Sequence, residues 1–171
     1  GKGDAESTAI TLGVEYTANP MWKGTAGLEL RDGATSDTIL STLGIASKLN
    51  RDWTFLGRNT FSLTRNKGTA TGEILLDRFQ AGVAYRETES NEWSGLARIE
   101  VKNEKDTTQP GIELKRSVEI LSLHGNYQPR RPFTLSGRYA AKIASDKSNG
   151  LVTKMNAQLI AGRATWEFAP R

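Results

Sequence analysis

Hydrophobic and polar residues alternate along most of this chain, and the alternation is clearest from Phe133 to Ile143. Apolar residues and glycine occupy every odd position of that stretch, whereas the even positions include Thr134, Arg138 and Lys142. A period of two indicates a β-strand whose two faces meet different surroundings. One face is apolar over about eleven residues while the other carries charges, and this length matches a tilted strand that crosses a lipid bilayer.

The same alternation predicts eight further strands. They are expected at Thr8–Ala18, Trp22–Arg31, Ile39–Leu49, Trp53–Thr64, Phe79–Arg86, Trp93–Lys102, Ser117–Tyr127 and Leu159–Phe168. Short turns such as Asn19-Pro20 separate some of these strands. Longer loops are expected at residues 32–37, 65–76, 103–115 and 145–150. Short and long connections therefore alternate, as in up-and-down hairpins whose short turns share one edge.

Aromatic residues gather beside the short turns. The residues concerned are Tyr16, Trp22, Trp53, Phe55, Tyr85, Trp93, Tyr127, Phe133, Trp166 and Phe168. Rings at one end of every hairpin are typical of the aromatic girdle that a membrane barrel places at the bilayer surface. A soluble sandwich has a core along the whole strand and no reason to sort its aromatics this way. A soluble antiparallel sheet with one buried face still explains the alternation and stays open as an alternative.

Composition excludes some classes of protein. No apolar run approaches the roughly 18 residues of a membrane helix, and the mean hydropathy of -0.49 alone would indicate a soluble protein. Alternation, however, averages the hydropathy of each barrel strand towards zero. The lack of cysteine excludes a disulfide framework and a thiolate metal site. The first residues are polar and form no signal peptide, so export would require that the true N-terminus lies elsewhere.

The fold expected from these patterns is all-β, an antiparallel up-and-down transmembrane β-barrel with residues 1–171 as a single domain. The segments Trp53–Phe55, Asp77–Arg86, Trp93–Arg98 and Leu135–Lys142 resemble the C-terminal β-barrel region of large modular proteobacterial outer-membrane proteins. The resemblance implies a location in the bacterial outer membrane. Single-chain bacterial barrels have even strand numbers, whereas about nine strands are predicted here. Further strands or subunits are therefore expected to complete a larger barrel.

Charged residues alternate with the aromatics and would line the lumen of such a barrel. The basic ones are Lys23, Arg31, Arg58, Arg86, Arg98, Lys102, Arg138, Lys142 and Arg163. The acidic ones are Glu15, Glu29, Glu100 and Glu167. Guanidinium and carboxylate groups on adjacent strands can pair and stiffen the wall. A basic surplus would instead favour small anions, in keeping with a formal net charge of +4. Both interpretations can hold together.

Catalysis finds little support in the sequence. Ser122, His124 and Asn126 share one strand face and are the residue types of a membrane phospholipase barrel. Residues two apart on a strand are, however, about 7 Å apart, and no nucleophile elbow accompanies them. No catalytic residue is therefore assigned. Asp32 and Asp37 do not match a calcium-loop spacing, so neither a metal nor a cofactor is expected.

The expected function is that of a passive pore whose basic lumen favours anions, with the lipid bilayer as its main partner. The alternative is a plugged structural or docking barrel that anchors a partner or a surface domain. A lipid-hydrolysing barrel enzyme and a soluble β-sheet binding protein are more remote alternatives. Nucleic acid is not expected as a partner, because the aromatics and the arginines lie on opposite faces of each strand.

Overall fold

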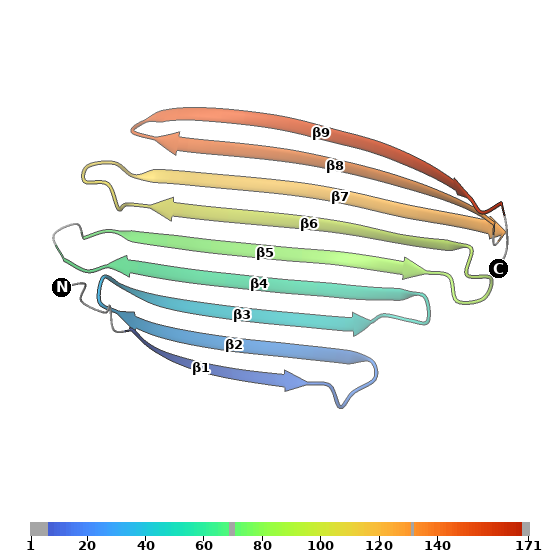
Figure 1. Cartoon of the computed structure of the whole chain (residues 1–171), viewed down its shortest axis with the longest axis horizontal. Helices are drawn as coiled ribbons and strands as arrows, with labels where there is room; N and C mark the ends of the chain where they lie inside the picture. The colour runs from blue at the N-terminus through green and yellow to red at the C-terminus, as the bar shows by residue number, and fades with distance from the viewer. Residues whose placement is uncertain (1–6, 69–70, 131, 169–171) are drawn as a thin grey trace.

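The computed structural model describes residues 7–68, 71–130 and 132–168. Its strands are β1 (Ser7–Tyr16), β2 (Trp22–Gly33), β3 (Ser36–Lys48), β4 (Trp53–Asn66), β5 (Glu73–Arg86), β6 (Trp93–Asp106), β7 (Leu114–Arg130), β8 (Phe133–Ser148) and β9 (Leu151–Trp166). Each strand pairs antiparallel with its sequence neighbours, so the sheet is an up-and-down meander in the order β1 to β9 (Figure 1). The predicted all-β antiparallel fold with nine strands is confirmed.

The sheet is a single layer. Contacts between strands occur only between neighbours in the sheet, and no large hydrophobic side chain is buried among the described residues. β1 and β9 are the two edges, and their side chains are exposed along the whole of both strands. These nine strands therefore do not close on themselves. Of the predicted barrel, the antiparallel sheet is confirmed, whereas closure into a barrel is not shown.

The described residues contain no helix that is long and apolar enough to span a membrane.

Cross-strand pairing assigns every residue to one of two faces, because directly opposed residues project from the same side of a sheet. The row of opposed residues through Trp22 contains Phe55. We call the side that carries these rings and Trp53 the apolar face, and the opposite side the polar face. Among the exposed large apolar side chains of β1 to β8, all but Leu56 and Leu96 belong to the apolar face.

The aromatic residues that begin successive even-numbered strands do not share one row of opposed residues. Each is offset by two residues in the register from the one that begins the next even-numbered strand. Trp22 shares its row with Phe55, Trp53 with Gly95, and Trp93 with Leu135. A displacement of two residues over two strand spacings corresponds to strands tilted by about 35° from the normal of a plane through these aromatics. Strand tilts of this size are typical of β-barrels.

Several connections are shorter than the sequence predicted. The β2–β3 and β8–β9 connections are two-residue turns at residues 34–35 and 149–150. β5 begins at Glu73, and β6 and β7 extend into the segment 103–115. The charged side chains that suggested loops pair across strands instead, as when Arg116 Nε donates to Asp146 Oδ1 at 2.9 Å. The predicted alternation of short and long turns is therefore wrong, because the end opposite the aromatics also contains tight turns.

The tight β8–β9 turn depends on backbone conformations that few residues adopt. Asn149 has a φ of 47° and Gly150 a φ of 84°, the pair of positive values found in hairpin turns of the Asn-Gly type. We expect Gly150→Ala to lower the free energy of unfolding by about 1 kcal/mol, because a Cβ is disfavoured at positive φ. Denaturant titration of the refolded protein, followed by tryptophan fluorescence, measures this change.

The matched control is Gly137→Ala in the middle of β8. A Cβ at this position meets no atom within 4 Å, and the backbone is extended. The control should therefore retain the wild-type midpoint. Equal losses in the two variants would show that the turn conformation is not what Gly150 provides.

Candidate functional site

Four aromatic pairs mark one end of the sheet, which we call the aromatic end. The ring centroids are 4.4 Å apart in Tyr16–Trp22, 4.8 Å in Trp53–Tyr85, 4.1 Å in Trp93–Tyr127 and 5.7 Å in Phe133–Trp166. All the residues predicted for the girdle take part except Phe55, which lies one step inward from Trp53, and Phe168, which follows β9 and is 91% exposed. The predicted clustering of rings at one end is present in the fold, while their contact with lipid stays a prediction.

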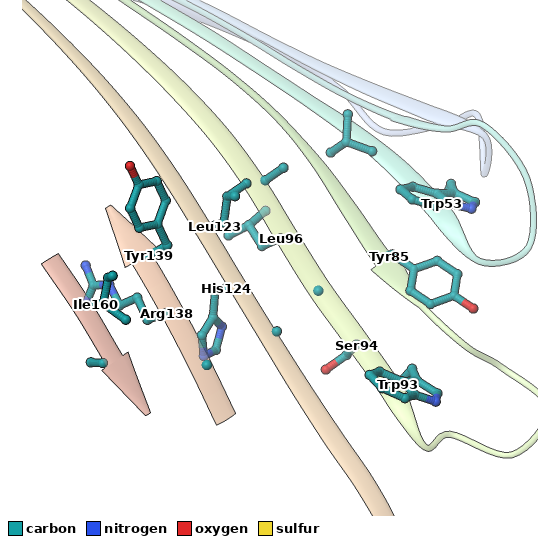
Figure 2. Close-up of a pocket in the computed structure, with 16 residues that line it drawn as sticks. Trp53, Tyr85, Trp93, Ser94, Leu96, Leu123, His124, Arg138, Tyr139 and Ile160 are labelled. Carbon is teal, nitrogen blue, oxygen red and sulfur yellow. The ribbon is translucent and has the colours of Figure 1, made fainter. Parts of the chain in front are cut away.

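A hollow of about 880 Å³ lies on the apolar face just inside these pairs (Figure 2). Directly opposed glycines form its floor, because Gly95 faces Gly125 and Gly125 faces Gly137. Figure 2 shows Trp53 at one side of the hollow and Tyr139 at the other. Arg138 and His124 are also among the residues that line the hollow, but the register places their side chains on the polar face. The apolar face itself supplies shape and no charged group there, so we assign this hollow no catalytic or cofactor role.

Two polar side chains interrupt the apolar face on β4 and β5. The Asn59 side-chain amide donates to Asp77 Oδ1 at 2.8 Å. One polar atom of each side chain therefore has a partner, which lowers the cost of placing the pair among apolar neighbours. The uninterrupted run of apolar positions along these two strands is consequently shorter than along β6 and β8.

All the basic residues predicted for the lumen lie on the polar face, as their cross-strand partners show. Three of them have partners: Arg31 pairs with Glu29 at 2.8 Å, Lys102 pairs with Glu104 at 3.0 Å, and Arg86 Nε donates to Asn91 Oδ1 at 2.9 Å. The others make no hydrogen bond or ion pair within the described chain. These are Lys23, Arg58, Arg98, Arg138, Lys142 and Arg163. Pairing thus accounts for the minority, and a surplus of unpaired cations remains.

The most buried charged group is Glu100, whose side chain is only 8% exposed. Arg78 Nε donates to Glu100 Oε1 at 2.9 Å, and Gln80 Nε2 donates to Glu100 Oε2 at 2.8 Å. Both carboxylate oxygens are therefore occupied. Arg78 was not among the predicted lumen residues, because β5 was expected to begin only at Phe79. Extending the alternation of β5 backwards by one residue would have found it.

The unpaired arginines of β4, β6 and β8 occur at one level of the sheet. Each follows, by the same sequence spacing, the aromatic residue that begins its strand: Trp53 and Arg58, Trp93 and Arg98, Phe133 and Arg138. Because those aromatics form the aromatic end, the three arginines lie at equal distances from that end along β4, β6 and β8. The repeated spacing is visible in the sequence, although it was not used to predict a site.

The residues considered for catalysis do not form a hydrogen-bonded set. The Asn126 side-chain amide donates to Ser94 Oγ at 3.3 Å, on the neighbouring strand. His124 is directly opposite Leu96 on one side and Arg138 on the other. No hydrogen bond joins Ser122 to His124 in the described chain. Nor do the described residues include a group of three or more histidine, cysteine or acidic side chains able to hold a metal ion.

The end opposite the aromatics contains paired charges. Lys105 of β6 and Lys115 of β7 are directly opposed, an arrangement that would be repulsive on its own. Glu113 lies between them, with Oε1 at 3.0 Å from Lys105 Nζ and Oε2 at 3.0 Å from Lys115 Nζ. Hydrogen bonds from Lys115 and from Lys105 lower the pKa of Glu113 below its usual value. The β6–β7 connection is therefore held by one carboxylate shared between two cations.

Removing Arg78 should be much more costly than removing an unpaired arginine. We expect Arg78→Met to lower the free energy of unfolding by about 2 kcal/mol, because it leaves a nearly buried carboxylate without its charged donor. The matched control is Arg98→Met, which removes the same side-chain type from the same face and should change stability little. The double variant Arg78→Met/Glu100→Gln should recover part of the loss. Equal effects of the two single variants in denaturant titrations would contradict this assignment.

The contribution of Glu113 should depend on pH. Because folding lowers its pKa, the stabilisation is present above the ordinary pKa of glutamate and is lost as the pH falls through the lowered value. Glu113→Gln should therefore unfold at a lower temperature than the wild type at pH 7. The two proteins should converge towards about pH 3, below the usual glutamate pKa. A difference in unfolding temperature that is as large in acid as at pH 7 would rule out the charge of Glu113 as its source.

Comparison of the sequence with protein-family models and with curated proteins found no match for this chain. The function is therefore inferred from how apolar, aromatic and charged side chains are distributed over the two faces.

Proposed function

We propose that this chain forms part of a transmembrane β-barrel in a bacterial outer membrane and that the barrel acts as a passive pore favouring anions. One observation carries the proposal: an apolar face that reaches every strand, is interrupted by Asn59, Asp77 and Glu119, and is covered by no other layer of the described chain. Exposed apolar patches larger than a few hundred Å² are rare on soluble monomers and mark contact with a membrane or a partner. A bilayer can cover such a face completely.

The dimensions of the apolar face support a membrane. On β6 its apolar positions run from Trp93 to Val101 and give way to Asn103; on β8 they run from Phe133 to Ile143 and give way to Ser145. At the tilt derived above, about nine residues cross the roughly 25 Å apolar band of an outer-membrane barrel. Both apolar runs reach this length, and aromatic pairs border them at one end.

The polar face supports a solvated interior that favours anions. It carries the unpaired cations described above, whereas its most buried carboxylate, Glu100, is held by Arg78 and Gln80. Basic rings lining a pore attract negative solutes. Because open sheet edges are not tolerated in hydrocarbon, further strands or subunits would pair with β1 and β9. The resemblance to outer-membrane barrel regions is consistent with this proposal.

Two neighbouring positions on β7 provide a test of which face meets lipid. Leu121 lies on the apolar face and Ile120 on the polar face. In a background whose native tryptophans are replaced by phenylalanine, Leu121→Trp should be quenched by lipids with brominated acyl chains. The matched Ile120→Trp should instead be quenched by a water-soluble quencher such as acrylamide. Equal lipid quenching at both positions, or none at either, would refute the membrane assignment of the two faces.

Planar bilayers distinguish the pore from a plugged barrel that only anchors a partner. The protein in its full membrane assembly should give stable conductance steps, and the reversal potential in a salt gradient should indicate preference for the anion. Membrane insertion without conductance would favour the plugged docking barrel. Steps selective for cations would contradict the role proposed for the basic wall.

A further inference from the structure

We propose that Arg98, Ser122, His124 and Arg138 form a binding site for a small oxyanion on the polar face. These residues come from three adjacent strands, β6, β7 and β8. The inference rests on the proposed function in one respect, that the polar face meets water. It goes further in locating a discrete site on the wall and in naming the chemical class of its ligand.

The register brings the four side chains together around β7. Ser122 is directly opposite Arg98, and His124 is directly opposite Arg138. Each arginine is also the diagonal neighbour of the other β7 residue. Direct partners have Cβ atoms about 4.5–5.5 Å apart, and diagonal positions are about 7–8 Å apart, within reach of long side chains. The two guanidinium groups can therefore converge from both sides on a ligand above Ser122 and His124.

All four side chains are available to a ligand. Arg98, His124 and Arg138 are exposed and Ser122 is half-buried, and none of them makes a hydrogen bond or an ion pair within the described chain. The two guanidinium groups supply only donors, the serine hydroxyl can donate as well, and none of these groups carries a negative charge. Guanidinium forks match the oxygens of phosphate, sulfate and carboxylate groups in a bidentate manner. The donor set therefore selects an oxyanion over a spherical anion such as chloride.

The nearest carboxylate on the same face does not compete for Arg98. Glu100 lies two residues away on β6, but its oxygens are occupied by Arg78 at 2.9 Å and Gln80 at 2.8 Å. Asp146 on β8 lies closer to the opposite end of the sheet and is paired with Arg116 at 2.9 Å. The acidic neighbours of the site are thus paired with other donors and leave its arginines free. Lys142, also unpaired, lies four residues from Arg138 on β8 and adds positive potential.

His124 adds a ring nitrogen to the site. The charged groups that face it on the polar side are Arg138 from β8 and Arg98 from β6, with Leu96, Ser94 and Ser136 as its uncharged neighbours.

Sulfate is a suitable probe because it is a small oxyanion whose oxygens guanidinium forks can bind. Isothermal titration of the full assembly with sodium sulfate should give saturable binding that sodium chloride at equal ionic strength does not reproduce. We expect Arg98→Gln and Arg138→Gln each to weaken sulfate binding about tenfold or more.

Lys23→Gln is the matched control. Lys23 lies in the same row of the polar face as Arg98, is also exposed and unpaired, but belongs to β2, four strands away. The Lys23→Gln substitution removes one positive charge and should change the sulfate affinity less than twofold. Unfolding midpoints identify any variant that is not folded. For such a variant, Arg98→Lys or Arg138→Lys retains the charge but lacks the fork, and should still weaken sulfate binding.

The outcomes separate this site from the pore. Loss of sulfate binding in Arg98→Gln, with Lys23→Gln unaffected, supports the site whether or not the protein conducts. Equal losses in both variants would show diffuse attraction by the wall and would overturn the site while leaving an anion-selective pore intact. Conductance without saturable sulfate binding would also overturn the site. Saturable binding in a protein that does not conduct would overturn the pore and leave the site standing.

Discussion

The ladder of antiparallel pairing between successive strands is the constraint on which the rest of this protein depends. No second layer or buried core connects distant parts of the described chain, so the register alone decides which side chains meet. A slip of one residue would exchange the two faces of a strand. Three of the four aromatic pairs join directly opposed residues, and the Asn149-Gly150 turn sets the β8–β9 alignment. These local features therefore preserve the separation of the apolar face from the polar face.

Charge is distributed unevenly along the polar face, and the unevenness has a simple origin. Towards the end opposite the aromatics, acids and bases are close enough to neutralise one another, as in the pairs of Arg116 with Asp146 and Lys102 with Glu104. Nearer the aromatic end, the strands carry arginine, serine and histidine with few acids. Glu100, the carboxylate two residues from Arg98 on β6, is held by Arg78. One buried interaction thus lets the neighbouring guanidinium groups remain free.

Much of the sheet could be predicted from the sequence, because alternation reports directly which residues share a face. The strand number, the antiparallel order and the side of every predicted basic residue follow from that period. The strand ends were harder to predict. Glu73–Leu76 and residues 103–106 are charged or lack clear contrast, so their pairing with neighbouring strands was not evident. The Asn149-Gly150 dipeptide is a strong hairpin signal, but the sequence interpretation instead expected a loop over residues 145–150, longer than the turn that the structure contains. The contact between Arg78 and Glu100 required knowledge of the register between β5 and β6, which no single strand contains.

The number of strands also determines how the sheet can be continued. In an antiparallel meander the odd-numbered strands all run the same way, so β1 and β9 both point towards the aromatic end (Figure 1). Joining them directly would create a parallel seam. Any element that bridges the two edges with antiparallel pairing must itself contribute an odd number of strands, the first and last running away from the aromatic end. An element with an even number of strands therefore cannot complete this sheet by antiparallel pairing alone.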